Sequence, residues 1–193
     1  MVTIVNIVDI LNCHFSCHYQ GTGASRLPVL AVYSAYKLFM KFERYKGKTL
    51  SLLKSHTTSS GIGDIEVLDE NGFFFEALEI KHNIPISSEL VQDVYQKFSE
   101  TPISRYYLLT TAEPNVDNAE TVNSLVCQIR TQHGCEVIVD GVLPSLKYYL
   151  RLLSDPKLFL DYYTKNLQLD FSQNTDIKRN HLTRWSELLD SLS

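Results

Sequence analysis

The chain has 193 residues, of which 44% are apolar, so it has enough hydrophobic material to bury a core. This composition excludes disordered and collagen-like proteins, and no apolar run approaches the roughly 20 residues that a membrane-spanning helix needs. The net charge of −4 argues against a protein that coats nucleic acid or anionic membrane by bulk charge alone.

The first residues do not have the pattern of a secretory signal. Met1 to Leu11 contains Asp9 and neither Lys nor Arg, and no small-residue cleavage site follows it. We therefore expect a cytoplasmic protein without membrane attachment, whose cysteines are thiols rather than disulfides. These cysteines are Cys13, Cys17, Cys127 and Cys135.

The pair Cys13 and Cys17 resembles half of a structural zinc site, which requires a second, distant ligand pair. Cys127 falls within a predicted helix and Cys135 at the start of a predicted strand, so they are poorly placed to complete it. Zinc is therefore the less favoured interpretation of this spacing.

Residues 27–46 are predicted to form a helix, because Pro28 suits a first turn and apolar side chains cover much of the circumference. Lys37, Lys41 and Arg44 follow at i, i+4 and i+7 and so form one basic stripe. A solvated helix face and a surface that contacts DNA phosphates are equally good interpretations of this stripe.

A hairpin follows in the sequence. Weak alternation predicts a first strand over 48–55, and a loop rich in Ser, Thr and Gly occupies 57–63. The runs 64–68 and 73–81 then flank Asn71-Gly72, which is the strongest local signal for a hairpin with a type I′ turn.

This turn predicts the register of the hairpin. Residue 68 pairs with 75, 66 with 77 and 64 with 79, so Asp64 lies opposite Glu79. Side chains alternate along a strand, so Lys81 and Glu66 share their face. Leu68, Phe73 and Phe75 occupy the same face nearer the turn.

The remaining elements alternate between helix and strand. Ser87 or Ser88 caps a helix that runs to about Ser99, and a strand over 105–111, a helix over 118–132 and a strand over 135–139 follow. The predicted fold is an α/β protein with an α-β-β-β-α-β core, a mixed sheet flanked by helices, and a helical C-terminal tail. The predicted domains are an N-terminal extension over 1–25, a core over 26–141, and a helical segment over 142–193 packed on the core.

The three carboxylates on the hairpin face need positive charge nearby, because crowded acids are costly. A divalent cation with a preference for oxygen ligands, Mg²⁺ or Mn²⁺, would supply that charge. The plainer interpretation is that Glu79-Ile80-Lys81 is a solvated strip of an edge strand.

The order of helix, acid, hairpin, Glu-x-Lys and helix resembles the PD-(D/E)xK nuclease superfamily, with Gly63 in place of the usual proline of its motif Gly63-Asp64 … Glu79-Ile80-Lys81. A closer resemblance is to SacI-like type II restriction endonucleases. It rests on Arg-Leu-Pro-Val-Leu-Ala from Arg26, Ile-Gly-Asp-Ile-Glu-Val, Glu-Ile-Lys-His-x-Ile-Pro-Ile and Arg-Tyr-Tyr-Leu-Leu-Thr-Thr, and it covers roughly Arg26 to Pro114.

The resemblance implies Mg²⁺-dependent hydrolysis of double-stranded DNA at a specific site by a homodimer, with Mn²⁺ as a possible substitute for Mg²⁺. Asp64 and Glu79 would hold the metal, helped by the Ile80 carbonyl, and Lys81 would orient or deprotonate the attacking water. Glu66 and Glu43 are additional acids that we leave outside the site. Two alternatives stay open, namely a repair or recombination nuclease such as a junction resolvase, and a truncated or degenerate DNA-binding fragment without catalysis.

Overall fold

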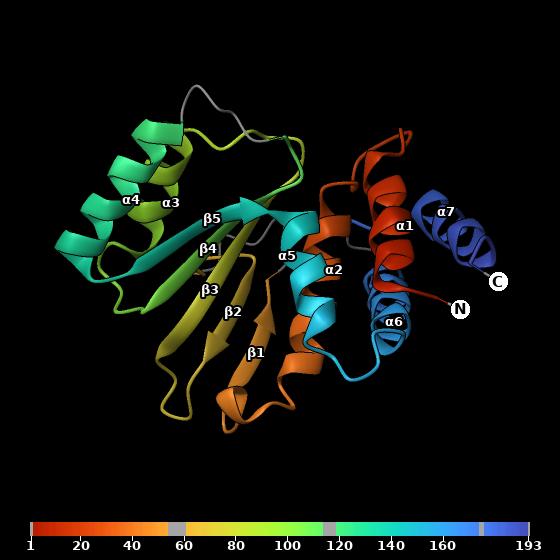
Figure 1. Cartoon of the computed structure of the whole chain (residues 1–193), viewed down its shortest axis with the longest axis horizontal. Helices are drawn as coiled ribbons and strands as arrows, with labels where there is room; N and C mark the ends of the chain where they lie inside the picture. The colour runs from red at the N-terminus through yellow and green to blue at the C-terminus, as the bar shows by residue number, and fades with distance from the viewer. Residues whose placement is uncertain (1, 54–60, 114–118, 174–175, 193) are drawn as a thin grey trace. The chain divides into compact units, whose positions relative to one another are not determined.

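The structure is a computed structural model that describes residues 2–53, 61–113, 119–173 and 176–192 (Figure 1). The chain divides into two compact units, one formed by Met1–Lys41 with Val142–Ser193 and the other by Phe42–Gly141. The second boundary coincides with the predicted one, whereas the first falls after Lys41 and not before Arg26. The helix that the sequence placed at the start of the core thus belongs to the other unit.

The unit Phe42–Gly141, called the sheet unit below, contains a mixed α/β layer structure. Within the described residues its sheet has five strands in the order β1-β2-β3-β4-β5, antiparallel from β1 to β3 and parallel from β3 to β5. The strands are β1 Thr49–Leu52, β2 Ile65–Leu68, β3 Phe74–Lys81, β4 Arg105–Thr110 and β5 Glu136–Gly141. Its helices are the 3₁₀ turn η1 Glu43–Tyr45, α3 Ser88–Phe98 and α4 Ala119–His133. The predicted mixed α/β fold with flanking helices is confirmed, and so is the order of these elements.

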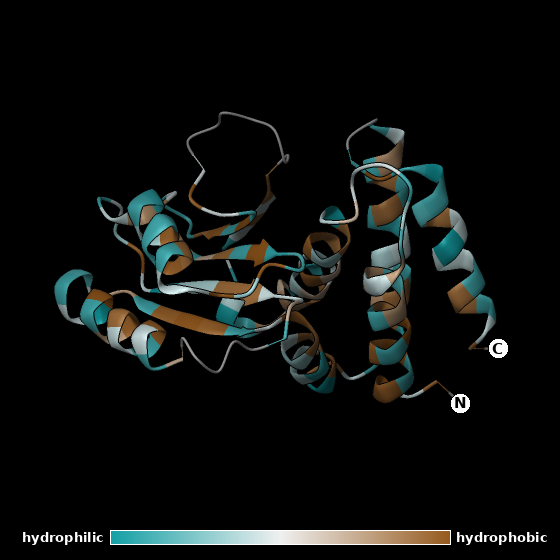
Figure 2. Ribbon diagram, turned by 90° about the horizontal axis from the view of Figure 1, so that it is seen from above, coloured by the Kyte–Doolittle hydropathy of each residue, from teal (hydrophilic) through white to brown (hydrophobic). Residues whose placement is uncertain are grey.

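Helices α3 and α4 pack against one face of the sheet. Ser87 caps α3, because its hydroxyl accepts the Leu90 N–H at 3.2 Å. The apolar sides of both helices and the inward side chains of β3, β4 and β5 form one hydrophobic cluster, and in Figure 2 the helices carry alternating hydrophobic and hydrophilic bands. Members of this cluster include Ala77, Val91, Val94, Phe98, Tyr106, Leu108, Val122, Ile129 and Val137.

The turn between β2 and β3 differs from the predicted type I′ turn. Gly72 has a φ of +83°, but Asn71 has no positive φ, which a type I′ turn requires. The Asp69 N–H donates to the Phe73 carbonyl at 2.8 Å, so the loop contains the three residues 70–72. The Asp69 side chain supports this loop, because its Oδ1 accepts the N–H groups of Asn71 and Phe73, each at 2.9 Å.

A β-bulge restores the register that this longer loop would have shifted. Leu68 pairs with Phe74 and not with the predicted Phe75, so Phe75 is an extra residue in β3. A one-residue shift would move every later side chain to the opposite face, and the extra residue cancels that shift. Glu66 accordingly pairs with Ala77, as the sequence predicted.

The bulge changes which phenylalanine faces helices α3 and α4. Phe74 packs against the hydrophobic cluster under these helices. The Phe75 ring instead lies 6.1 Å from the Tyr45 ring and 5.3 Å from the Arg44 guanidinium carbon. The prediction that Phe75 shares a face with Glu79 is therefore wrong.

The other unit, called the helical unit below, consists of helices in its described part. They are α1 Ile4–Ser16, α2 Arg26–Phe39, α5 Val142–Arg151, α6 Leu158–Ser172 and α7 Arg179–Asp190. The helical tail is confirmed, and the segment treated as an N-terminal extension forms α1, which packs with α5 and α7. No helix in the described ranges is both long and apolar enough to cross a bilayer.

Helix α2 ends at Phe39, before the predicted end of the helix. Phe42 has an extended backbone (φ −83°, ψ 150°), and the chain then forms the separate turn η1. Lys37 therefore lies on α2 in the helical unit, whereas Arg44 lies in η1 of the sheet unit, and Lys41 lies between these elements. The prediction that Lys37, Lys41 and Arg44 form a stripe along one helix face is wrong, because α2 ends before Lys41 and Arg44.

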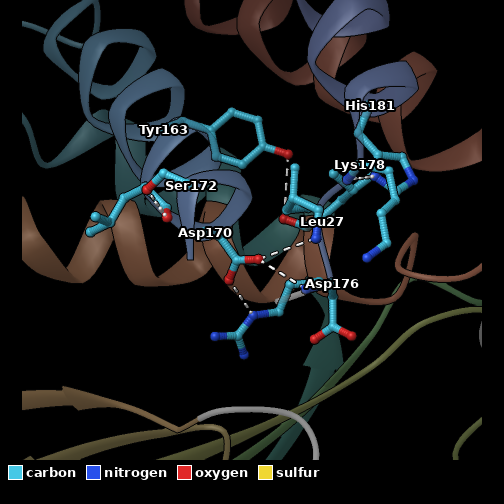
Figure 3. A network of polar contacts seen from close by, with 10 residues as sticks. Leu27, Tyr163, Asp170, Ser172, Asp176, Lys178 and His181 are labelled. Atoms are coloured by element: carbon cyan, nitrogen blue, oxygen red, sulfur yellow. Dashed lines mark hydrogen bonds and ion pairs between the residues drawn. The ribbon is translucent and has the colours of Figure 1, made fainter. Parts of the chain in front are cut away.

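A buried polar network holds the helical unit together, with Asp170 of α6 at its centre (Figure 3). Arg26 Nε donates to Asp170 Oδ2 at 3.0 Å, and both side chains are at most 6% exposed. The N–H groups of Asp176 and Ile177 donate to the other carboxylate oxygen at 3.2 Å. Because both oxygens of the Asp170 carboxylate accept hydrogen bonds, this ion pair fixes the start of α2 against the chain that leads into α7.

His14 of α1 is completely buried beside this network. Its Nδ1 lies 3.0 Å from the Tyr163 hydroxyl and its Nε2 lies 3.1 Å from the His181 carbonyl. A neutral ring that carries its proton on Nε2 satisfies both contacts. Burial lowers the pKa of His14 to about 4; the His181 carbonyl opposes this shift, and the charges of His181 and Arg184 add to it.

We expect the helical unit to lose stability as the pH falls from about 6.5 to about 4. In this window the unfolded chain binds a proton at His14 that the folded protein does not bind, and the loss levels off below the folded pKa. The shift corresponds to a loss on the order of 3 kcal/mol in the free energy of unfolding. Denaturant unfolding at several pH values measures it, and His14→Gln should flatten the decline, whereas the same change at exposed His18 should not. A decline that His14→Gln leaves unchanged would assign the pH dependence to other groups.

Candidate active site

Strand β3 places Glu79 and Lys81 on the side of the sheet that helices α3 and α4 cover. Glu79 pairs in register with Leu108, and Ala77 with Tyr106, which are members of the cluster under these helices. The Lys81 Nζ contacts Glu79 Oε1 at 2.5 Å, and the Glu79 side chain is only 6% exposed. The predicted Glu-x-Lys motif is therefore a largely buried ion pair and not a solvated strip.

Helix α3 contributes a second ammonium group, which sequence reasoning missed. The Lys97 Nζ contacts the same Glu79 Oε1 at 2.8 Å. The available signal was weak: Lys97 follows Val94 by three residues and precedes Phe98, so it lies at the edge of the buried side of α3. Only the packing of α3 on β3 shows that this edge faces Glu79.

Asp64 reaches the same place from the loop that leads into β2. Its Oδ2 accepts the Ile80 N–H at 2.8 Å, and its backbone carbonyl accepts the Leu53 N–H at 2.9 Å. In a strand the N–H and C=O of one residue point toward the same side, so the Ile80 carbonyl also points to the side of β3 that Asp64 occupies. The hairpin thus brings together Asp64, Glu79 and Lys81, as the sequence predicted.

The loop before Asp64 is held against β2, β3 and β4 by three contacts. The Tyr106 hydroxyl donates to the Ile62 carbonyl at 2.5 Å, and the Ile62 N–H donates to Glu66 Oε1 at 2.7 Å. Gly63 lies so close to β3 that a Cβ there would be 2.7 Å from the Leu78 carbonyl oxygen. Only glycine fits at this approach, which gives a physical reason for Gly63 where the resembling family has proline.

The electrostatics of the site reflect two acids beside two lysines. Burial raises the pKa of Asp64 to about 6, and the negative charge of Glu79 adds to this rise. The hydrogen bond from Ile80 and the charges of Lys81 and Lys97 oppose it. The four charges balance, so the site is neutral as a whole when all of them are ionised.

The donor atoms fit a hard divalent cation. Among the described residues, Asp64 Oδ1 and Glu79 Oε2 take part in no hydrogen bond or ion pair, so each carboxylate keeps one oxygen for a ligand. The Ile80 carbonyl adds a third oxygen on the Asp64 side. No group of three His, Cys, Asp or Glu side chains gathers within the described ranges, and Mg²⁺ commonly uses one or two carboxylates with water and substrate oxygens.

The two other acids noted in the sequence, Glu43 and Glu66, do not bind at the candidate site. Glu43 is exposed and pairs with Lys46 at 3.3 Å. Glu66 is buried and accepts the Ile62 N–H, so it supports the backbone before Asp64. Most of the predicted Ser, Thr and Gly loop falls in 54–60, which lies outside the described residues.

The predicted DNA-contacting cations have separate surroundings. Lys37 and Lys41 are exposed in the helical unit, with their Nζ atoms 5.3 Å from the Tyr33 ring and 5.6 Å from the Tyr162 ring. In the sheet unit, Arg44 pairs with Glu76 at 3.1 Å. Contact of Lys37, Lys41 and Arg44 with DNA stays a prediction.

The cysteines carry free thiols. Cys13 and Cys127 are exposed, Cys17 is partly buried and Cys135 is buried. Cys127 lies within α4 and Cys135 directly before β5, as predicted.

Comparison with known proteins yields no assignment. The chain matches no protein-family model, and no curated protein matches it significantly.

We expect Gly63→Ala to destabilise the sheet unit by about 1–3 kcal/mol, because its Cβ would overlap the Leu78 carbonyl and push the Asp64 loop from β3. An alanine at an unstrained, open glycine position would instead stabilise the protein by about 0.4–1 kcal/mol. The sign of the change in the free energy of unfolding therefore distinguishes a close approach from an open position. Urea unfolding of the variant and the wild type measures the difference. Equal or higher stability of Gly63→Ala would contradict the close approach of the two backbones.

Proposed function

We propose that the chain is a metal-dependent DNA endonuclease of the restriction type, with Asp64, Glu79 and Lys81 as its catalytic residues. The observation that carries this proposal is the meeting of the Asp64 and Glu79 carboxylates beside the Lys81 ammonium at the end of the β2–β3 hairpin. The order of elements around them is the one expected for the PD-(D/E)xK superfamily, and the resemblance to SacI-like enzymes supports double-stranded DNA as substrate.

Phosphodiester hydrolysis needs a positioned water and compensation for negative charge. Asp64, Glu79 and the Ile80 carbonyl would hold Mg²⁺, with Mn²⁺ as a substitute; the ion would lower the pKa of a bound water and draw charge from the scissile phosphate. Lys81 is held by Glu79, so its remaining N–H donors can bind a phosphate oxygen or orient the water. The attacking water would give up a proton to solvent as its oxygen forms a bond to phosphorus, the bond to the leaving ester oxygen would break, and that oxygen would take up a proton from a solvent water.

Lys97 compensates charge in this proposal and takes no part in the reaction itself. Its ammonium shares Glu79 Oε1 with Lys81, so it neutralises the buried carboxylate and leaves Oε2 for the metal. With one carboxylate oxygen tied to two cations, Glu79 has little freedom to rotate.

A palindromic DNA site is read by two symmetric subunits, so the proposal includes a homodimer. The aromatic residues of the tail do not all serve an interface, because Phe159, Tyr163 and Trp185 are buried within the helical unit. Tyr148 and Leu152 of the tail are 58% and 47% exposed and are available for contact with a second copy.

Asp64→Asn and Glu79→Gln should each reduce Mg²⁺-dependent cleavage of plasmid DNA on the order of 10²-fold or more, because each removes a charged ligand. The matched control is Asp93→Asn, which changes an exposed acid of α3. Gel analysis measures the rate, and sequencing of the ends shows whether the cut is at a defined site. A wild-type protein that binds DNA without cutting it would favour the non-catalytic alternative, and cuts at branched junctions only would favour a resolvase.

Lys81→Met and Lys97→Met should have different effects. Both variants should bind Mg²⁺ somewhat more tightly than the wild type, because in each one ammonium no longer competes for Glu79. Lys81→Met should suppress cleavage on the order of 10²-fold, because Lys81 acts on the water and the phosphate, whereas Lys97→Met should retain cleavage. Calorimetric Mg²⁺ titration and plasmid cleavage measure both; equal loss of cleavage in the two variants would contradict the separate roles.

A further inference from the structure

The sheet unit contains a pocket of about 400 Å³ at the end where β4 and β5 begin. Three guanidinium groups line it, those of Arg44, Arg105 and Arg130, together with Phe75 and Ser104. Arg105 pairs in register with Glu76, three residues before Glu79, which is about 10 Å along β3. The pocket is therefore distinct from the Asp64 site, with which it shares no residue.

Arg44 is held in place by the start of β3. Its Nη2 contacts Glu76 Oε2 at 3.1 Å, and the Tyr45 hydroxyl donates to the other oxygen of Glu76 at 2.6 Å. The Arg44 guanidinium carbon also lies 5.3 Å from the centre of the Phe75 ring. Buried Glu76 is thus neutralised, and the side chain of Arg44 is fixed while 45% of it remains exposed.

Arg105 is anchored in the same way on the neighbouring strand. Its Nε donates to Glu136 Oε2 at 3.1 Å, and these two residues are register partners in β4 and β5. This contact occupies Nε, so the terminal nitrogens of the guanidinium keep their N–H donors for a ligand.

Arg130 completes the set from the last turn of α4. It is exposed and has no acidic partner among the described residues, so its whole guanidinium can turn toward a ligand. Gly134, which follows α4 with a φ of +84°, leaves open space beside the pocket because no atom lies within 4 Å of a Cβ built there. The exposed Ser104 is a further residue of the lining with a hydroxyl donor.

The charge of the pocket favours an anion. Three arginines face two carboxylates, Glu76 and Glu136, which leaves a net charge of +1. Lys48 adds a further positive charge nearby, because its Nζ lies 4.4 Å from the centre of the Phe75 ring. Two of the arginines are already oriented, which reduces the entropy lost when a ligand binds.

We propose that this pocket binds a phosphoryl group in its dianionic form, as in inorganic phosphate or a phosphomonoester. The planar fork of a guanidinium matches two oxygens of a phosphate, and three terminal oxygens suit three arginines that approach from different elements. The source is either a small phosphorylated molecule or the phosphorylated end of a nucleic-acid strand. The inference does not depend on the proposed nuclease activity.

The first test is calorimetric titration of the whole chain with sodium phosphate in EDTA, which removes any divalent metal from the other site. We expect saturable binding of phosphate and none of acetate at the same ionic strength. Arg130→Gln and Arg105→Gln should each weaken phosphate binding by about tenfold or more, the loss of a charge-assisted hydrogen bond. The control Arg151→Gln, at an exposed position of the helical unit, should bind phosphate like the wild type.

Arg130→Gln should melt at the wild-type temperature, because Arg130 is exposed and unpaired within the described part of the chain, so weaker binding cannot be attributed to unfolding. Absence of saturable phosphate binding, or phosphate binding that Arg130→Gln leaves unchanged, would overturn the proposal.

A second arm distinguishes the two sources. A short duplex with 5′-phosphates and the same duplex without them are titrated under the same conditions. Tighter binding of the phosphorylated duplex, lost in Arg130→Gln, assigns the pocket to a strand end. Equal binding of both duplexes together with saturable phosphate binding assigns it to a small phosphorylated molecule.

Discussion

The hydrogen bond from the Ile80 N–H to the Asp64 carboxylate joins the two parts of the candidate site. It ties the loop before β2 to the strand that carries Glu79 and Lys81, so the acids come together only if the hairpin has the correct register. Several contacts outside the site hold the loop in the position that this hydrogen bond requires. Gly63 allows the loop to approach Leu78, and Tyr106 and Glu66 hold the same loop through the two backbone groups of Ile62.

The site is costly for the folded protein, as functional sites often are. Partial burial and the nearby Glu79 raise the pKa of Asp64, which means that the ionised form is disfavoured there. Lys81 and Lys97 offset this cost by sharing one oxygen of Glu79. Replacement of a buried ion pair by apolar groups is often neutral or stabilising, so stability alone does not explain two lysines on one carboxylate. The role proposed above, binding of a cation and a phosphate, would account for both lysines.

Strands β3 and β4 carry two different charged sites at different positions along their length. Glu79 contacts two lysines at one position, and Glu76 orients Arg44 at another. Their separation by an odd number of residues places their side chains on opposite faces of β3. In both sites a buried carboxylate fixes a cation that retains free N–H donors, which is the arrangement required to bind a phosphate oxygen repeatedly in one geometry.

The sequence by itself determined the order of helices and strands in the sheet unit, the mixed sheet, and the meeting of Asp64 with Glu79 and Lys81, because these follow from local periodicity and from short-range pairing across one hairpin. It did not determine the three-residue turn or the bulge at Phe75, two departures that cancel in the register. Tertiary structure alone decided that α2 stops at Phe39 and that Lys97 and Arg44 meet acids of β3. These contacts join residues far apart in the chain. They are selected by the free energy of packing and of pairing buried charges, which no local sequence pattern encodes.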